Sequence, residues 1–404
     1  MLRRDVVAGL GTMAASFGAA KAADKPIRMN PHLPDGTRDE ASMARLPGKQ
    51  PLIRLTERPP NYETPIGVFR DAITPNDRFF VRYHLAGIPS MENLRDWSLS
   101  IGGDAAEHPS RFTMAELQKS FKSEEVTAVC QCSGNQRGLS EPHVPGVQWG
   151  QGAMGNAIWR GVRLKDVLQK VGVRNGAVEV WFAGADRPVM AATPAFQKSL
   201  PLPMAMADDV LIATSMNGQP LPPLNGYPAR LIVPGWTGTY WMKHLTSVEI
   251  STKPQPNFWT RKAYRVPAGM FAVDRPFESQ QDSATWPITE IVVNSAIAEP
   301  LDGTRGTRAG FKVRGVAWDR GHGIKSVEVT FDAGKTWRPA VLGQDLGKYA
   351  FRAFSLASGI LRPGPCVVSA RAVSNAGESQ ATALVRNPAG YHNNVPQTLT
   401  VMVA

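Results

Sequence analysis

Two cysteines that stand two positions apart, Cys130 and Cys132, precede a run of small and polar residues that ends at Arg137. An apolar, β-prone stretch at 126–129 comes directly before them, so we expect the pair where a strand passes into a loop. In such a loop, backbone N–H groups around Gly134 and the Arg137 guanidinium would favour the thiolate form of Cys132. A thiolate can bind a soft metal or act as a nucleophile, and this pattern leaves both open.

Other interpretations of the cysteine pair need partners that the sequence does not supply. A cysteine before Ser-Gly is more often a small buried hydrophobic residue. A tetrahedral zinc site needs two further ligands, and no clustered histidines are present. A cysteine protease needs a partner histidine, and His84 and His143 are available but lack a local signature. Three cysteines in 404 residues exclude a disulfide framework.

The composition is that of an ordinary globular protein, with 43% hydrophobic and 20% charged residues. The 33 prolines and 37 glycines interrupt any long helical period and favour a loop-rich, mainly β chain. The length predicts two or three domains. The formal net charge of +11 suits anionic ligands or partners. Because the basic residues are dispersed, nucleic-acid binding is not expected.

Residues 1–22 have the layout of an export signal. Arg3 and Arg4 precede a mild apolar stretch, and residues 20–22 form an A-x-A cleavage signal. The adjacent arginines are typical of twin-arginine export of a folded protein, and an ordinary secretory signal is the alternative. Both predict a mature protein in the periplasm. No later apolar run reaches about 20 residues, so membrane insertion is not expected.

The remaining pattern predicts an α+β fold in two blocks. Residues 23–60 are polar and proline-rich and are expected to form an extended arm. Residues 61–265 mix short strands with helices at 114–121 and 164–171. Residues 280–404 show short alternating strands, which predict an all-β immunoglobulin-like sandwich. The strands expected there are 288–294, 310–319, 324–331, 348–355 and 366–374.

Several segments, in chain order, resemble the molybdenum domain of the sulfite oxidase family. They are 79–89, 132–137, 152–162, 216–222, 225–235 and 238–243. Residues 387–393 resemble part of that family's dimerisation domain. The resemblance covers about residues 50–404. It implies that 61–265 is a sulfite-oxidase-type molybdopterin domain and that 280–404 is the dimerisation domain.

The resemblance implies a molybdenum cofactor with a pyranopterin, in which one cysteine binds the metal. Cys132 matches that ligand, whereas Cys130 and Cys366 would be structural. The positions that match the family's cofactor-binding residues are Phe80, Val81, Arg82, Tyr83, His84, Asp186, Asn225, Arg230, Trp241, Met242 and Lys243. Some depart from the animal enzymes: Asn225 stands in place of a histidine and Tyr83 in place of an asparagine. Trp241 and Met242 are also altered.

The resemblance further implies that sulfite, or a similar small oxyanion, is the substrate. Arg82 and Arg137 match the family's anion-binding arginines, and guanidinium groups suit a small oxyanion well. Tyr264 matches its active-site tyrosine, and His84 would orient Arg82 or add a donor. A further cationic group is expected late in the chain, where His392 is the candidate.

Sulfite oxidation releases two electrons, which need an acceptor. The segment before residue 60 is too short for the haem domain of the animal enzymes, and no haem or flavin module is visible after the second block. We therefore expect no haem in this chain and a separate c-type cytochrome as partner, with a homodimer as one assembly. Plant-type nitrate reductase, an exported molybdenum reductase acting on a sulfoxide or other oxyanion, and a non-enzymatic binding protein are the alternatives.

Overall fold

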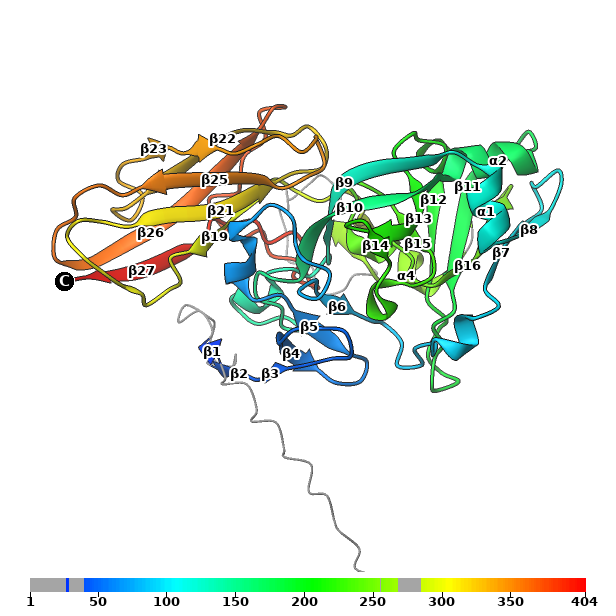
Figure 1. Cartoon of the computed structure of the whole chain (residues 1–404), viewed down its shortest axis with the longest axis horizontal. Coiled ribbons are helices and arrows are strands. Elements are labelled where there is room, and N and C mark those ends of the chain that lie inside the picture. The colour runs from blue at the N-terminus through cyan, green and yellow to red at the C-terminus, as the bar shows by residue number, and fades with distance from the viewer. Residues whose placement is uncertain (1–26, 29–39, 255, 268–284) are drawn as a thin grey trace, which may run out of the picture.

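The computed structural model describes residues 27–28, 40–254, 256–267 and 285–404, so the predicted signal at 1–22 lies outside the described residues. The described chain has two regions, a mixed α/β block and a β-sandwich, which lie at opposite sides of Figure 1. Within the described part of the chain, no helix is long and apolar enough to cross a membrane.

The mixed block contains two five-stranded sheets. The first runs in the order β14-β13-β10-β9, with β15 also paired to β13. Its strands are β9 (Ser123–Gln131), β10 (Met154–Arg163), β13 (Leu211–Met216), β14 (Gln219–Pro220) and β15 (Arg230–Ile232). The second runs in the order β12-β11-β16-β7-β8. Its strands are β7 (Ser98–Gly102), β8 (Ser110–Thr113), β11 (Glu179–Gly184), β12 (Gln197–Pro201) and β16 (Leu245–Ser251).

Four short α-helices accompany these sheets among the described residues. They are α1 (Met114–Ser120), α2 (Leu164–Val171), α3 (Leu202–Ala205) and α4 (Phe258–Arg261). α1 begins with a capping box, in which the Thr113 hydroxyl accepts from the Glu116 backbone N–H and the Glu116 carboxylate accepts from that of Thr113. α2 ends at Gly172, whose φ of 78° favours glycine. The helices predicted at 114–121 and 164–171 are confirmed.

Part of the segment predicted to be an extended arm is paired into a sheet. β3 (Met43–Ala44), β4 (Leu52–Thr56), β5 (Asn61–Glu63) and β6 (Val81–Arg82) form four antiparallel strands, and β1 (Ile27–Arg28) pairs with β2 (Glu40–Ala41). Leu52 and Ile53 are buried in this four-stranded sheet. The prolines around the short apolar stretch that forms β4 favoured the prediction of an extended arm over a strand. The sheet matters for function because its last strand carries Arg82.

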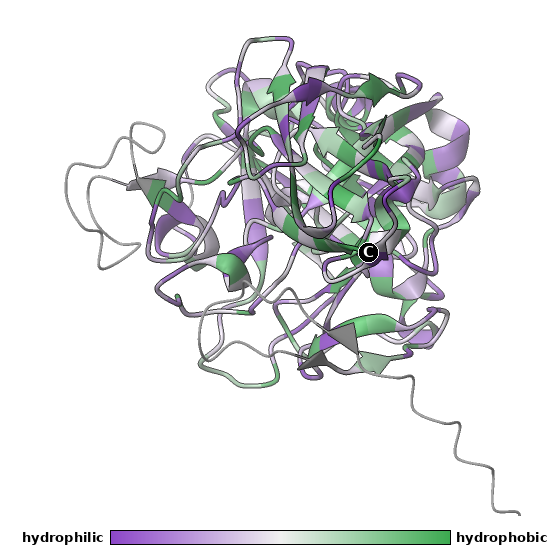
Figure 2. Cartoon of the chain, turned by 90° about the vertical axis from the view of Figure 1, so that its left-hand side faces the viewer, coloured by the Kyte–Doolittle hydropathy of each residue, from purple (hydrophilic) through white to green (hydrophobic). Residues whose placement is uncertain are grey.

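The second region is a sandwich of two sheets, in the orders β19-β21-β25-β24 and β20-β27-β26-β22-β23. Its strands are β19 (Asn294–Glu299), β20 (Arg305–Gly306), β21 (Lys312–Trp318), β22 (Ile324–Thr330), β23 (Arg338–Pro339), β24 (Val341–Leu342), β25 (Arg352–Ala357), β26 (Gly364–Ser374) and β27 (Thr398–Val403). Buried valines such as Val313, Val329 and Val368 fill the space between the sheets. Figure 2 shows hydrophobic residues along interior strands and many hydrophilic residues in the loops. The predicted α+β class, with a mixed domain followed by an all-β sandwich, is confirmed.

The junction between the regions explains a strand that was predicted wrongly. The expected strand at 288–294 is absent, and β19 begins only at Asn294. Upstream of β19, β17 (Arg265–Pro267) pairs with β18 (Thr285–Pro287). The segment between β18 and β19 lies along the mixed block and is hydrogen-bonded to it. There, Thr237 N donates to Thr289 O at 2.8 Å, and Ile291 N donates to Gly235 O at 2.9 Å. Ile288 and Ile291 are therefore buried at the junction, whereas Val293, directly before β19, packs in the sandwich core.

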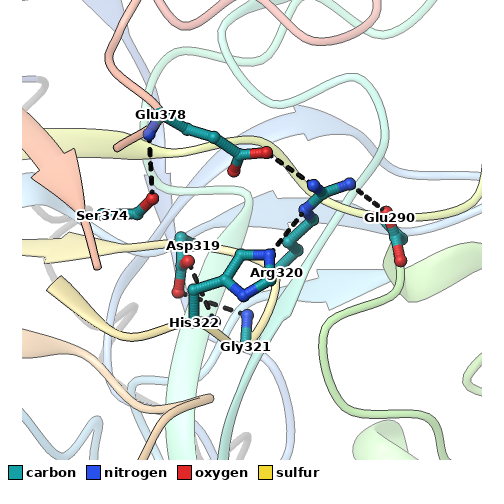
Figure 3. A network of polar contacts seen from close by, with 7 residues as sticks. All are labelled: Glu290, Asp319, Arg320, Gly321, His322, Ser374 and Glu378. Carbon is teal, nitrogen blue, oxygen red and sulfur yellow. Dashed lines mark hydrogen bonds and ion pairs between the residues drawn. The ribbon is translucent and has the colours of Figure 1, made fainter. Parts of the chain in front are cut away.

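Polar contacts also fasten the junction (Figure 3). Arg320 reaches two carboxylates, with Nη1 2.5 Å from Glu290 Oε2 and Nη2 2.5 Å from Glu378 Oε1. Asp319 shapes the turn that carries Arg320, because its Oδ2 accepts from the His322 backbone N–H at 3.0 Å. The network ties the segment after β18 to two loops of the sandwich.

Candidate active site

A cavity that is partly open to solvent lies where loops from both sheets of the mixed block meet. The residues that line it come from seven separate stretches of chain. They are Phe80, Arg82, His84, Cys130, Cys132, Ser133, Asp186, Phe196, Leu224, Asn225, Arg230, Gly238, Thr239, Trp241, Met242, Lys243 and Tyr264. Of the predicted site residues, Val81, Tyr83, Arg137 and the late candidate His392 are missing from this lining. The structure therefore brings most of the predicted constellation together.

Cys132 stands where β9 passes into a loop, as the sequence predicts. Its backbone N–H donates to Ala153 O at 2.8 Å, and its side chain is 9% exposed and faces the cavity. All three cysteines of the chain are buried and free. Cys366 lies in the sandwich core, where Sγ is 3.2 Å from Phe331 O. Cys132 is thus a thiol presented to an enclosed space.

Cys130 also lines the cavity, although it was expected to be purely structural. Its sulfur lies 3.2 Å from Nη2 of Arg230, and burial raises the pKa of its thiol. The Cys130 side chain therefore helps to place an arginine of the cavity wall.

Arg230 is a buried guanidinium held at one wall of the cavity. Nη1 donates to Asn225 O at 3.0 Å, and the group lies over the rings of Trp159 and Trp241 at 5.4 and 5.7 Å. Its Nε has no hydrogen-bond partner among the described residues, nor do the hydroxyls of Ser133 and Thr239. Buried polar atoms without partners are rare and costly. These three atoms therefore fit a polar, anionic group such as a pterin phosphate.

Two more cations lie close to this wall. Lys243 Nζ donates to Arg82 O at 2.6 Å, and Lys49 Nζ donates to Asn76 O at 2.6 Å and to the Asn225 side chain. Burial is the main cause that lowers the pKa of both lysines to about 7, and for Lys243 the neighbouring Arg230 adds to it. A bound anion would favour their charged forms.

Asp186 is an acidic residue that lines the cavity and interacts with the charge of Lys243. It follows β11 and is half-buried. Burial raises the pKa of Asp186, while Lys243 acts in the opposite direction. A carboxyl in this environment can accept hydrogen bonds from a heterocycle such as a pterin.

Val81 and Tyr83 lie one layer behind the cavity. Val81 is fully buried in the small sheet. The Tyr83 hydroxyl is 2.8 Å from His244 Nε2, and His244 Nδ1 is 2.6 Å from Tyr227 O. Since Nδ1 must donate to that carbonyl, Nε2 accepts from Tyr83. Tyr83 therefore supports the wall, and its ring also lies 3.9 Å from Lys243 Nζ.

Arg82, Tyr264 and His84 form a hydrogen-bonded chain at the other end of the cavity. Arg82 Nη2 lies 3.3 Å from the Tyr264 hydroxyl, and that hydroxyl also bonds His84 Nε2. Burial, followed by the charges of Arg82, Lys243 and Lys198, lowers the pKa of His84 well below its ordinary value. His84 is therefore neutral. The Tyr264 oxygen accepts from Arg82 and is also hydrogen-bonded to Nε2 of His84.

Arg137 lies outside the cavity lining, close behind it. Its Nε donates to Ala389 O at 2.6 Å and its Nη1 to Val147 O at 3.1 Å. A Cβ at Gly134 would lie 2.5 Å from Nη2, so this loop can enclose the guanidinium only with glycine there. The guanidinium also lies 5.3 Å from the ring centre of Tyr391.

His392 is not the late cationic group that the resemblance led us to expect. It does not line the cavity, and burial lowers its pKa to about 4, so its ring is neutral. The neighbouring Tyr391 contributes instead: its ring stacks on that of Tyr264, with centres 5.6 Å apart and planes 10° apart. The second region therefore completes the site through an aromatic ring.

Sequence reasoning missed several residues of the cavity wall. Phe196 stacks on His84 with ring centres 3.7 Å apart, and Lys198 lies behind it, buried against tyrosine rings. Ser133 and Thr239 supply hydroxyls, and Leu224 adds an apolar contact surface. Ser133 and Thr239 lie inside matched segments, which was a usable signal. Phe196 and Lys198 precede α3 in a stretch with no motif.

Comparisons with known proteins agree with this geometry. Residues 85–259 match the family described as the oxidoreductase molybdopterin binding domain, and 285–402 match the Mo-co oxidoreductase dimerisation domain. The chain therefore belongs to the class of proteins that combine an oxidoreductase molybdopterin binding domain with a Mo-co dimerisation domain. This class agrees with a cavity that combines a thiol, a guanidinium and buried hydroxyls without partners.

The relatives narrow the class further. Mitochondrial sulfite oxidase of Rattus norvegicus is 33% identical over 305 residues, 73% of this chain and 54% of that protein. The enzyme of Drosophila melanogaster is 34% identical over 311 residues, 74% of this chain and 52% of that protein. The NADH nitrate reductase of Spinacia oleracea is 31% identical over 385 residues, which are 89% of this chain and 41% of that protein. The chain spans about half the length of the sulfite oxidases it matches.

A solved structure covers more of the fold. The sulfane dehydrogenase SoxCD from Paracoccus pantotrophus is similar with a TM-score of 0.73 and 28% identity, over 85% of each chain. Together these findings show that the protein belongs to the sulfite oxidase family.

Proposed function

We propose that the protein oxidises sulfite to sulfate at a molybdenum pterin centre whose metal is bound by Cys132. The overall reaction converts one sulfite and one water into one sulfate, two protons and two electrons. When bound, the cofactor would supply the two-electron redox chemistry and the site of oxygen transfer. The observation that carries the proposal is the meeting of Cys132, Arg82 and Tyr264 at one cavity, from three distant parts of the chain.

One set of the chain's own residues would hold the cofactor, and another would bind the substrate. Arg230, Lys243 and the hydroxyls of Ser133 and Thr239 would hold the pterin and its phosphate. Arg82 would bind the oxyanion, since its guanidinium forms charge-assisted hydrogen bonds with oxygen. The Tyr264 hydroxyl would donate to an oxygen of the substrate or product, and His84, hydrogen-bonded to the same hydroxyl, would exchange a proton with it.

The electrons would leave to an external c-type cytochrome in the periplasm, after export by the twin-arginine route. The two-arginine start at residues 3–4 supports that location, and the net charge of +11 favours a partner with an acidic face. The sandwich matches a dimerisation domain, which supports a homodimer.

Product stoichiometry tests the proposal. Purified holoenzyme is given sulfite and excess oxidised cytochrome c, and sulfate is quantified by ion chromatography. We expect two cytochromes reduced for each sulfate formed, with no sulfate when cytochrome is omitted. Sulfate formation that consumes oxygen rapidly without cytochrome would contradict the proposed acceptor, and the absence of sulfate would contradict the substrate.

Oxidation of a sulfane sulfur is a second candidate, favoured by the likeness to SoxCD over 85% of the chain. The position of Arg137 behind the cavity lining also leaves Arg82 as the arginine that faces a substrate. Parallel assays with sulfite and with a protein-bound persulfide distinguish the two. A higher kcat/KM for the persulfide would favour the second candidate.

A further inference from the structure

Lys198, in β12, is a lysine whose side chain is completely buried, with 0% exposure. Its Nζ donates to Trp259 O at 2.7 Å. No carboxylate pairs with it in the part of the chain that the structure describes; the ammonium instead lies 4.3 Å from the ring centre of Tyr240 and 5.3 Å from that of Tyr264. Lysine is almost never fully buried without a charged partner, because its ammonium loses its hydration. This position therefore calls for a functional reason.

Lys198 contacts three segments that together form one wall of the cavity. Tyr240 follows Gly238 and Thr239, which line the cavity, in a single 3-10 turn. Trp259 packs on His84, with ring centres 5.2 Å apart. Lys198 thus braces this wall from the side away from the cavity.

The third of these contacts is Tyr264, which lines the cavity itself. It has a φ of 58°, a backbone conformation that bulky residues rarely adopt. Such a conformation persists only where surrounding contacts hold it. Lys198 and the stacked ring of Tyr391 are two of those contacts.

The charge of Lys198 also acts on the site. The titratable groups that face it are Tyr240, Tyr264, His84 and Arg265. Burial, and after it Arg265, lowers the pKa of Lys198 to about 7. In an interior of low effective dielectric, a positive charge behind the Tyr264 ring attracts an anion in the cavity.

We propose that Lys198 is a positioning residue that holds Tyr264 and supplies the additional positive charge of the anion pocket. This role rests on the proposed function, and it provides from β12 the cation that the sequence suggested at His392. By linkage, an anion that binds the charged form of Lys198 more tightly also raises its pKa by the same free energy. Anion affinity is therefore highest where Lys198 is protonated, below about pH 7, and falls as pH rises through that value.

Sulfate, the product of the proposed reaction, is a suitable probe because it keeps its charge over the pH range of interest. Its dissociation constant is measured by calorimetry on purified holoenzyme at about pH 6 and about pH 9. The variants are Lys198→Met, which removes the charge, and Lys198→Arg, which keeps it at both values. Lys170→Met, which removes an exposed charge on α2, is the matched control.

We expect Lys198→Met to weaken sulfate binding about tenfold at the lower pH, the change that accompanies a pKa shift of one unit. The difference from wild type should vanish at the higher pH. Lys198→Arg should bind more tightly than wild type at the higher pH, and Lys170→Met should match wild type at both. If Lys198→Met loses the same sulfate affinity at both pH values, the role of Lys198 is structural and the proposal is overturned.

If Lys198→Met does not fold, Lys198→Arg is compared with wild type alone. Equal sulfate affinity of Lys198→Arg and wild type at the higher pH would also overturn the proposal. Sulfite turnover by the wild-type enzyme is scored separately. A protein that binds sulfate with this pH dependence but does not oxidise sulfite would contradict the proposed function and leave the role of Lys198 intact.

Discussion

Arg82 Nη2 lies 3.3 Å from the hydroxyl oxygen of Tyr264, although 182 positions separate the two residues in the sequence. The contact joins the last strand of the small N-terminal sheet to the segment that follows α4. The same hydroxyl is also hydrogen-bonded to Nε2 of His84. An anion-binding cation and a proton route thereby share one oxygen atom.

Arg82→Gln should raise KM for sulfite about tenfold to a hundredfold, with a smaller loss in kcat. The reason is that a hydrogen bond to a charged group contributes about 1.5–3 kcal/mol, and Arg82 is the arginine that lines this end of the cavity. Steady-state kinetics measure it. An unchanged KM would remove Arg82 from substrate binding.

Arg137→Gln, by comparison, should lower the melting temperature and change KM less than Arg82→Gln. Its guanidinium donates to backbone carbonyls of Val147 and Ala389 rather than facing the cavity. Thermal unfolding and kinetics on the same preparation check this. A larger KM effect at Arg137 than at Arg82 would show that the two roles are reversed.

Tyr264→Phe should lower kcat by about a hundredfold, the usual scale for loss of a positioned proton donor. The ring remains, so the stack on Tyr391 is kept and KM should change little. Stopped-flow measurement of the first turnover gives the rate. A variant with the wild-type rate would exclude the Tyr264 hydroxyl from proton transfer.

Cys132→Ser should lose both turnover and bound molybdenum, because a hydroxyl is a poor ligand for a soft metal. Cys130→Ser should retain most of its molybdenum, since a serine oxygen can still accept from Arg230. Cys366→Ser, in the sandwich core, is the control. Metal analysis of the three purified variants identifies the ligand. Loss of molybdenum from Cys130→Ser but not from Cys132→Ser would mean that Cys130 binds the metal.

Arg230→Met should reduce the pterin content of the purified protein, while Arg230→Lys should retain part of it. The methionine removes the buried Nε, which has no hydrogen-bond partner in the part of the chain that the structure describes, and lysine restores a charge without the planar guanidinium. Pterin released from the protein and oxidised is quantified by its fluorescence. Full pterin content in Arg230→Met would contradict a role for this residue in holding the cofactor.

The sequence predicts this fold best where a local period decides the structure. α2 was predicted with its observed ends because its apolar residues Leu164, Val167, Leu168 and Val171 follow a helical repeat, and all four are buried. The strand expected at 288–294 shows the limit. Ile288 and Ile291 are buried at the junction of the two regions and Val293 in the sandwich core. Alternation alone cannot tell which neighbour buries each residue.

In the site too, residues inside a local motif could be predicted, whereas residues brought together only by the fold could not. Cys132, Arg230 and Lys243 lie in matched segments, so the resemblance found them. The enclosure of Arg137 depends on Ala389, 252 positions away, and this distance along the chain leaves no local pattern. Lys198 looks like an exposed strand lysine in sequence, and only the approach of Tyr240 and Tyr264 from distant loops buries it.

The most direct test of the account is sulfite-dependent reduction of cytochrome c with molybdenum quantified in the same sample, for wild type and Cys132→Ser. We expect one molybdenum per wild-type chain, cytochrome reduction that scales with molybdenum content, and neither property in the variant. Sulfite-dependent reduction by wild-type protein that contains no molybdenum, or by Cys132→Ser at the wild-type rate, would contradict it.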